Sequence, residues 1–329
     1  MKVLLTGADG FLGSNITREL LANGHEVRIL LLPGHKALTL EGLPIERFTG
    51  NLLNLNDVLG AVQGCTAVIH AAASTSVWPT RNERVRQVNI QGTDNIIQAV
   101  LQHSIQRLVY VSTASSFGFG SLEAPGDETR PYRSAKYRLD YVDSKFEAQQ
   151  LVLKAVKEKQ LPAIIVNPCF MFGPYDSVPS SGAMIVAVCK GKVPGYSNGG
   201  RNYAHVKDVA TGIVNALTKG RIGECYILGN KNLTYKEVFA LIAKITGSKT
   251  PHIPIPPLLT KCYGLLNTLF GKLTGKTPTL NYSLSLIACD DHYYSTAKAV
   301  KELDLPQTPI EIAVRESFDW LRDKHYLDK

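Results

Sequence analysis

The sequence predicts an α/β fold in which a doubly wound parallel sheet is joined to a smaller, interleaved carboxyl-terminal substrate domain. Two observations predict the sheet. An apolar strand runs into a glycine-rich turn and a helical segment at the start of the chain, and strand-like and helix-like segments alternate after it. Such alternation forms parallel sheets because the crossovers are right-handed. A third observation, the several loop-like stretches after residue 174, predicts the smaller domain.

The glycine-rich turn comprises residues 6–13, with glycines at positions 7, 10 and 13. It follows the apolar residues 3–5 and precedes a segment with helical spacing of apolar residues. Gly7 allows a tight turn, Gly10 lets a pyrophosphate approach backbone N–H groups, and Gly13 lets the helix pack close to the strand. The positive end of the helix then faces the phosphates. This pattern predicts a Rossmann-type dinucleotide site, and a glycine-rich turn without a ligand is the alternative.

Length and composition set the broad class. A chain of 329 residues, 44% hydrophobic and 19% charged, suits one large globular domain or two interleaved ones. The six cysteines are scattered without a C-x-x-C pair, which argues against a disulfide scaffold or a metal site and for the reducing cytoplasm. The first strand starts at Lys2, so we expect no signal peptide, and no apolar run approaches the ~20 residues that span a bilayer.

The net charge of +8 is unevenly distributed. Seven lysines and one acidic residue, Glu237, lie between Lys231 and Leu280. A solvated face, a lid over an anionic substrate and a contact with a membrane surface are the three interpretations left open. No nucleic-acid-binding motif accompanies the lysines, so we expect no nucleic-acid partner.

The preference between NAD and NADP is undecided by the sequence. Residues 27–31 read as the second strand, whose end usually carries an acidic residue for NAD or an arginine for NADP. Leu31 and Leu32 occupy those places, while Arg28 lies inside the strand and Lys36 beyond it.

Two later strands also end in informative residues. Residues 67–73 form an apolar strand that runs into Ala71, Ala72 and Ala73, and residues 108–113 form a strand that ends in hydroxyl groups. Ligands of doubly wound sheets bind at the carboxyl ends of strands, so Gly7, the alanines and Thr113 are expected at one site. Close packing alone is the alternative explanation of the alanines.

Catalysis is predicted for Tyr141 and Lys145, which lie four residues apart and share a helix face. A neighbouring cation favours the phenolate, so we expect Lys145 to lower the pKa of Tyr141 and fit it for proton transfer. The same spacing occurs at Tyr132/Lys136, Tyr203/Lys207 and Tyr294/Lys298. Only Tyr141 heads a long amphipathic helix, and an exposed surface pair is the alternative.

Eight groups of residues occur in one order along the chain: Thr6-Gly7-x-x-Gly10-x-x-Gly13, Asn51-Leu52, His70-Ala71-Ala72-Ala73, Asn89 with Gly92-Thr93-x-Asn95, Val111-Ser112-Thr113, Tyr141-x-x-Ser144-Lys145, Asn167-Pro168 with Gly173-Pro174, and Arg201-Asn202-Tyr203-x-His205-Val206-x-Asp208. Together they resemble the extended short-chain dehydrogenase/reductases, the NAD-dependent epimerase/dehydratase family. Trp78 and residues 167–174 are similar to its dihydroflavonol-reductase-like branch, which includes hydroxysteroid dehydrogenases and hopanoid-associated sugar-epimerase-like proteins.

The resemblance implies NAD or NADP as cofactor and a role for each matching residue. The implied catalytic residues are Thr113, Tyr141 and Lys145. The implied cofactor contacts are Gly7, Gly10, Phe11, Leu12 and Gly13 at the pyrophosphate, Asn51 and Leu52 at the adenine, Ala71, Ala72 and Ala73 at the phosphate and ribose, Asn89, Tyr141, Lys145, and Pro168 at the nicotinamide. The implied substrate contacts are Ser115, Asn167 and Arg201.

Three positions depart from the family pattern. Asn51 stands where Asp is frequent, Phe117 replaces a usual Tyr, and Asn167 replaces an Arg common in sugar-nucleotide enzymes. A dehydratase is disfavoured because Ala114 and Ser115 occupy the places where that chemistry needs a carboxylic acid.

The predicted domain division assigns residues 1–170, with 203–230 returning to them, to the NAD(P)-binding part. Residues 171–202 and 231–329 form the substrate-binding part. Residues 251–257 read as a stiff linker, and residues 258–270 as an apolar helix. We expect that helix to pack in the core of the small domain, with membrane docking or contact with a large apolar substrate as alternatives.

The predicted function is an NAD(P)-dependent reductase or dehydrogenase that moves a hydride between nicotinamide and a carbonyl or secondary alcohol, with a small molecule as substrate. The alternatives are a nucleotide-sugar epimerase, favoured by Arg201, and a dinucleotide-binding sensor without chemistry, disfavoured by the intact Thr113, Tyr141 and Lys145. A homodimer is compatible with the sequence.

Overall fold

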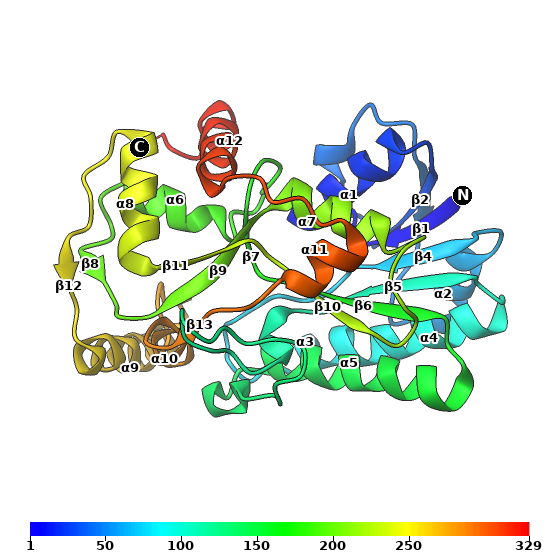
Figure 1. The fold of residues 1–329 in the computed structure, drawn as a ribbon, viewed down its shortest axis with the longest axis horizontal. Helices are drawn as coiled ribbons and strands as arrows, with labels where there is room; N and C mark the ends of the chain where they lie inside the picture. Colours follow the sequence, from blue (N-terminus) through cyan, green and yellow to red (C-terminus); the bar gives the residue numbers. More distant parts are fainter. Residues whose placement is uncertain (329) are drawn as a thin grey trace.

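The computed structural model describes residues 1–328 and contains a central sheet of seven strands in the order β10-β6-β5-β4-β1-β2-β3 (Figure 1). Every neighbouring pair in this sheet is parallel. The strands are β1 (Lys2–Thr6), β2 (Glu26–Leu31), β3 (Glu46–Thr49), β4 (Ala67–His70), β5 (Arg107–Val111), β6 (Ala163–Pro168) and β10 (Cys225–Leu228). The order reverses between β1 and β4, and that reversal creates the crevice in which such sheets bind ligands.

Helices cover both faces of this sheet, because successive residues of each buried strand are apolar and point to opposite sides. Leu4 of β1 packs in the core shared with α2 (Leu55–Val62), α4 (Gly92–Gln102) and α5 (Asp140–Lys159). Its neighbours Val3 and Leu5 pack in the core shared with α1 (Phe11–Ala22), α7 (Val206–Asn215) and α11 (Ala297–Leu303). Figure 1 shows these two helical layers on opposite sides of the sheet. The predicted doubly wound parallel sheet is confirmed.

A second, smaller sheet contains β7 (Phe170–Phe172), β9 (Gly200–His205), β11 (Lys231–Thr234) and β13 (Asp291–His292). It packs with α6 (Gly182–Cys189), α8 (Tyr235–Thr246) and α12 (Ile310–Asp323) around a third apolar core. A short pair, β8 (Gly195–Tyr196) with β12 (Ile253–Pro254), leads to α9 (Pro257–Thr274) and α10 (Tyr282–Ala288). The chain therefore visits the smaller part, returns to the large sheet through α7 and β10, and leaves it again.

Two expectations for the carboxyl-terminal third need correction. Residues 297–305 were expected with the substrate-binding part, but Ala299, Leu303 and Leu305 pack in the core of the large sheet beside α7. Core packing of residues 258–270 is wrong, because α9 buries only Thr260, Gly264 and Gly271 and leaves its large apolar side chains exposed. Within residues 1–328, no helix has the length and apolar character needed to cross a bilayer.

Candidate active site

The glycine-rich turn joins β1 to α1 and has the backbone geometry predicted for Gly7 and Gly13. Gly7 has φ +72°, and a Cβ there would lie 2.7 Å from the backbone N of Ala72. A Cβ at Gly13 would lie 1.9 Å from the carbonyl oxygen of Gly7, so only glycine lets α1 approach β1 this closely. A Cβ at Gly10 would meet only Gly7 O, at 3.4 Å.

The first turn of α1 offers a place for a pyrophosphate. Gly10 caps the helix without a side-chain hydrogen bond, and no acidic residue lies in the first turn. The N–H groups of Phe11, Leu12 and Gly13 therefore lie at the helix end without a capping side chain to accept from them. A Cβ at Gly7 or Gly13 would clash with the backbone, so only glycines allow this tight turn. The turn, which we call the glycine cradle, and the start of α1 together fit the pyrophosphate of a dinucleotide.

A buried chain of hydrogen bonds ties the ends of β1 and β4 to the helix beyond them. Thr93 Oγ1 donates to the carbonyl of Asn89 (2.7 Å), so it accepts from His70 Nε2 at 3.1 Å. His70 Nδ1 then accepts from Thr6 Oγ1 at 2.7 Å. Burial lowers the pKa of His70 to about 3, so the ring is neutral. A neutral ring is what this series of hydrogen bonds requires, because Nδ1 must accept.

Asn89 lies in a π-helical turn (Gln87–Gln91) just before α4 and braces the loop that follows β4. Its Oδ1 accepts from the N–H of Ser74 at 2.8 Å, and its Nδ2 donates to Ser144 Oγ on α5 at 2.9 Å. The side chain of this predicted cofactor contact is thus engaged by protein groups. It fixes the loop of Ala71, Ala72 and Ala73 relative to the helix that carries Tyr141.

The predicted adenine side is also held in place. Asn51 Oδ1 accepts from the N–H of Leu53 at 3.0 Å, and the carbonyl of Leu52 accepts from Asn95 Nδ2 at 2.9 Å. The side chain of Leu52 packs so closely on Gly92 that a Cβ there would lie 2.6 Å from Leu52 Cδ2. Contact of Asn51 and Leu52 with adenine stays a prediction.

The start of α5 is anchored by charged residues from an earlier segment. Arg81 pairs with Asp140 at 2.6 Å and with Asp143 at 3.0 Å, and the N–H of Asp140 donates to the carbonyl of Thr80. Tyr132 donates to the other oxygen of Asp143 at 2.6 Å. These bonds hold the first turn of α5, on which Tyr141 lies.

Lys145 lies one turn beyond Tyr141 and forms one hydrogen bond within residues 1–328, to the end of β5. Its Nζ donates to the carbonyl of Val111 at 2.6 Å and lies 4.6 Å from the centre of the Tyr110 ring. Burial lowers the pKa of Lys145 to about 7. The prediction that Lys145 lowers the pKa of Tyr141 is wrong for the protein without cofactor. Burial raises the pKa of Tyr141, and Lys145 does not offset this effect.

The hydroxyl groups after β5 lie in a 3-10 turn (Ala114–Ser116). Thr113 Oγ1 accepts from the N–H of Ser115 at 3.3 Å, and the carbonyl of Thr113 accepts from Asn167 Nδ2 at 2.9 Å. Asn167 also donates to Gln149 at 2.7 Å and is fully buried. β6 ends at Asn167 and the buried Pro168, beside Thr113. Through its bond to the carbonyl of Thr113, Asn167 holds the 3-10 turn in position.

A cavity of about 140 Å³ opens at Tyr141. It is lined by Val77, Ser115, Ser134, Tyr137, Leu139, Tyr141, Val142, Arg201, Leu284, Ile287 and His292. Three residues predicted at the site, Ser115, Tyr141 and Arg201, are thereby brought together from distant parts of the chain. Thr113, Lys145 and Asn167 do not line this cavity.

Arg201, on β9, forms no ion pair within residues 1–328. Its Nε donates to the hydroxyl of Tyr235 at 2.7 Å, and its guanidinium lies 5.2 Å from the centre of the Phe170 ring. Its remaining N–H groups stand at the cavity wall without a carboxylate partner.

Two cavity residues, Tyr137 and His292, were not identified from the sequence. Tyr137 donates to Asp290 at 2.5 Å and accepts from His292 Nε2 at 3.0 Å. Burial lowers the pKa of His292 to about 3, so the ring is neutral. The two residues are 155 positions apart and belong to no motif, so only their contact in the fold identifies them.

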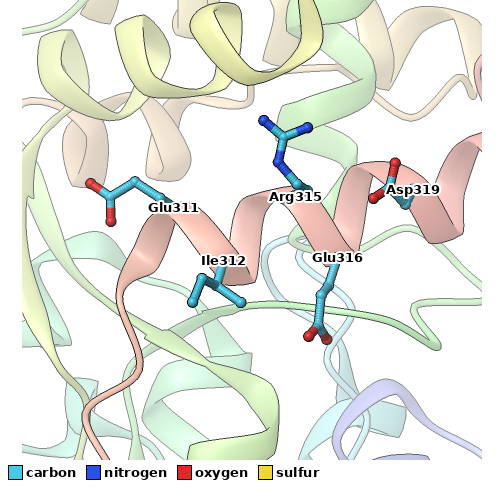
Figure 2. Close-up of a pocket in the computed structure, with 5 residues that line it drawn as sticks. All are labelled: Glu311, Ile312, Arg315, Glu316 and Asp319. Carbon is cyan, nitrogen blue, oxygen red and sulfur yellow. The ribbon is translucent and has the colours of Figure 1, made fainter.

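Another depression, of about 270 Å³, lies on the surface of α12 and is lined by Glu311, Ile312, Arg315, Glu316 and Asp319. Figure 2 shows that these side chains come from a single helix and that Arg315 and Glu316 point away from each other. No group of side chains converges there, so the cavity at Tyr141 is the better candidate site.

Comparisons with known proteins agree with this geometry. Residues 3–229 match the model of the NAD dependent epimerase/dehydratase family. The chain is 32% identical over 330 residues to a putative dihydroflavonol 4-reductase from Synechocystis, which covers 98% of this chain and 95% of that protein. It is 27% identical to sterol demethylase protein B from Methylococcus capsulatus, covering 98% and 99% of the two chains.

Solved structures give the same result. The crystal structure of gox2253 superposes with a TM-score of 0.87 at 33% identity over 99% of both chains. A nucleoside-diphosphate-sugar epimerase from Pseudomonas aeruginosa superposes with a TM-score of 0.83 at 25% identity, covering 100% of this chain and 99% of that one. With the glycine cradle, the hydroxyl turn and the Tyr141/Lys145 helix in the family's order, the chain belongs to the NAD dependent epimerase/dehydratase family and is an NAD(P)-dependent oxidoreductase of the extended short-chain dehydrogenase/reductase type.

Proposed function

We propose that this enzyme interconverts an apolar ketone and the corresponding secondary alcohol, with Tyr141 carrying the proton. The supporting observation is the lining of the cavity at Tyr141, where five side chains are aliphatic: Val77, Leu139, Val142, Leu284 and Ile287. An aliphatic wall favours a substrate with an apolar body, because the hydroxyl groups of a sugar ring would lack partners against it.

The glycine cradle and the first turn of α1 would hold the pyrophosphate of the cofactor, and its nicotinamide would supply or accept the hydride. Because burial raises the pKa of Tyr141, its phenol carries its proton at neutral pH. A protonated phenol suits donation to the carbonyl oxygen of a ketone. In this proposal the hydroxyl of Thr113 holds the same oxygen, and Lys145 contacts the cofactor ribose.

The polar end of the cavity adds a second element of recognition. Arg201, His292 and Tyr137 lie there, and Arg201 is the charged member without a carboxylate partner in residues 1–328. We therefore expect the substrate to carry an anionic group, or a strong hydrogen-bond acceptor, in addition to the carbonyl that reacts. Such a group would accept hydrogen bonds from the guanidinium N–H groups that have no other partner.

A nucleotide-sugar epimerase is the second candidate, and Arg201 is the observation that favours it. A guanidinium at this position would also hold a diphosphate, which is the group that a nucleotide sugar presents. The aliphatic wall formed by α10 and Leu139 supports the ketone instead.

The test is a panel of substrates with the purified full chain and both reduced cofactors, followed through the absorbance of reduced nicotinamide. Bulky apolar ketones that carry a carboxylate should be reduced, and their uncharged esters should show a higher KM. UDP-sugars should neither be turned over nor raise the melting temperature. Epimerisation of a UDP-sugar, with no reduction of any ketone, would contradict the proposal.

We also place the enzyme in the reducing cytoplasm. Its six cysteines are all unpaired, which supports a compartment in which thiols stay reduced.

A further inference from the structure

The helix α9 (Pro257–Thr274) faces solvent with its apolar side and faces the protein with its small and polar side. The residues that it buries are Thr260, Gly264 and Gly271. Its large apolar side chains are exposed, among them Leu258, Leu259, Leu266, Leu269, Phe270 and Leu273. The surface helices of a soluble protein normally have the opposite orientation.

The geometry of the helix makes this exposed side continuous. At 3.6 residues per turn, these six side chains and Tyr263 and Leu265 occupy about 160° of the helix circumference. Leu273 is 86% exposed, Leu258 71% and Leu266 65%. An exposed apolar patch of this kind on a folded chain indicates an interaction surface.

Close packing on the opposite side fixes this orientation. A Cβ at Gly264 would lie 2.4 Å from Ser285 Oγ on α10, and a Cβ at Gly271 would lie 3.1 Å from the indole of Trp78. Thr268 accepts from the N–H of Tyr282 at 2.8 Å. A rotation of α9 that buried its leucines would lose these contacts, so the apolar side is held outward. Figure 1 shows α9 beside α10 at the outer edge of the small domain.

The positive charge around α9 indicates which kind of partner this apolar side would bind. Between Glu237 and Asp290 the chain carries five lysines and no acidic residue. Lys261 and Lys272 lie on α9, and Lys276 follows it. Within residues 1–328 none of these three lysines forms an ion pair. A second copy of the chain docked through α9 would bring these uncompensated lysines together, which like-charge repulsion disfavours.

We propose that α9 binds the interface of a lipid bilayer that contains anionic headgroups, with its leucines among the acyl chains and its lysines at the phosphates. An apolar helix face bordered by lysines is the arrangement by which helices lie in a membrane interface without crossing it. The helix packs on α10, whose Leu284 and Ile287 line the cavity at Tyr141. Under the function proposed above, the cavity would then lie one helix away from the lipid that holds an apolar substrate.

The test is flotation of the full chain, without substrate, on vesicles of phosphatidylcholine with or without a third of phosphatidylglycerol. The protein should float with the anionic vesicles and less with the neutral ones, and added salt should weaken the anionic preference. The double variant Leu266→Ser/Leu269→Ser should bind about a hundredfold more weakly, about tenfold for each leucine. Each of Lys261→Gln, Lys272→Gln and Lys276→Gln should weaken anionic binding about fivefold and leave neutral binding unchanged.

The matched control is Ile312→Ser, which removes an exposed apolar side chain from α12, away from α9. It should float like the wild type. Cofactor-induced shifts in melting temperature show whether each variant is folded, and because no substrate is present the result is independent of the proposed reaction. Folded wild type that stays unbound would overturn the proposal, and so would a leucine variant that floats as well as the wild type. A dimer that the leucine substitutions dissociate, in protein that does not float, would make α9 a contact between copies instead.

Discussion

The Nζ of Lys145 donates a 2.6 Å hydrogen bond to the backbone carbonyl of Val111, the last residue of β5. This bond joins the helix that carries Tyr141 to the strand end that leads to Thr113. Burial of the ammonium group lowers its pKa to about 7, and no carboxylate in residues 1–328 pairs with it. The protein alone therefore holds a costly charge at the candidate active site, and a polar group of the cofactor would relieve that cost.

This burial predicts a particular dependence of stability on pH. Below pH 7, Lys145 is charged in the folded and the unfolded chain, whereas between pH 7 and about pH 10 only the unfolded chain is protonated at this position. The unfolded state then binds more protons, so the contribution of Lys145 to stability rises with pH across this window. It is lost as pH falls from about 10 to 7 and does not change further below pH 7. The free energy of unfolding of the wild type should rise relative to Lys145→Met by about 1.4 kcal/mol for each pH unit.

Urea denaturation of both proteins without cofactor at pH 7, 8 and 9 measures this difference. Other titrating groups cancel because both proteins share them. A difference between the two that is constant across these pH values would mean that the folded chain keeps Lys145 protonated throughout.

The proton-donor role that we propose for Tyr141 predicts the effect of Tyr141→Phe. Loss of the phenol should lower kcat by about a thousandfold, as removal of a general acid does, and leave the Kd of the cofactor nearly unchanged. Tyr203→Phe is the matched control. Tyr203 has the same spacing to a lysine, and its buried hydroxyl has no partner in the described chain, so its loss should not lower kcat or stability. Steady-state kinetics with cofactor titration measures both effects, and a Tyr141→Phe enzyme with wild-type turnover would remove Tyr141 from this role.

The turn after β1 allows backbone strain to be separated from a steric clash. Gly7 and Gly24 have nearly equal φ, +72° and +71°, but a Cβ at Gly24 meets nothing within 4 Å while one at Gly7 lies 2.7 Å from Ala72 N. Gly24→Ala should cost about 1 kcal/mol, the expense of the left-handed conformation. Gly7→Ala should cost at least about 2 kcal/mol more and lower cofactor affinity. Chemical denaturation of both variants gives the free energies, and equal losses would show that the loop of Ala71 and Ala72 yields to the methyl group.

The sequence predicted the glycine turn well because local geometry determines it. The φ of Gly7 and the contact of Gly13 with Gly7 O depend on a strand, a turn and a helix that are adjacent in the chain. The strand predicted at residues 27–31 lies within β2 (Glu26–Leu31), because a mostly apolar run of this length identifies a buried strand.

Features that depend on contacts between distant segments were not predictable. The bond from Tyr137 to Asp290 joins residues 153 positions apart. The pKa of Tyr141 was expected to fall because Lys145 lies four residues away on the same helix face. The bond of Lys145 to Val111 and the burial of the phenol, however, depend on how α5 packs against the end of β5. The apolar residues of α9 indicated a core helix, and only the close packing at Gly264 reveals which side faces inward.

The end of β2 allows the cofactor preference to be engineered. Leu32 directly follows β2, is 39% exposed and stands where an arginine would meet a 2′-phosphate. Leu32→Arg should therefore raise affinity for NADP about tenfold relative to NAD, by adding a charge-assisted hydrogen bond to that phosphate. Leu38→Arg, at a more exposed leucine in the next turn, is the matched control for a general gain of positive charge. Titration of each variant with both dinucleotides measures the ratio of the two Kd values. If Leu38→Arg changed the ratio as much as Leu32→Arg, the gain would come from overall charge, and the end of β2 would not be the place where this enzyme meets the ribose.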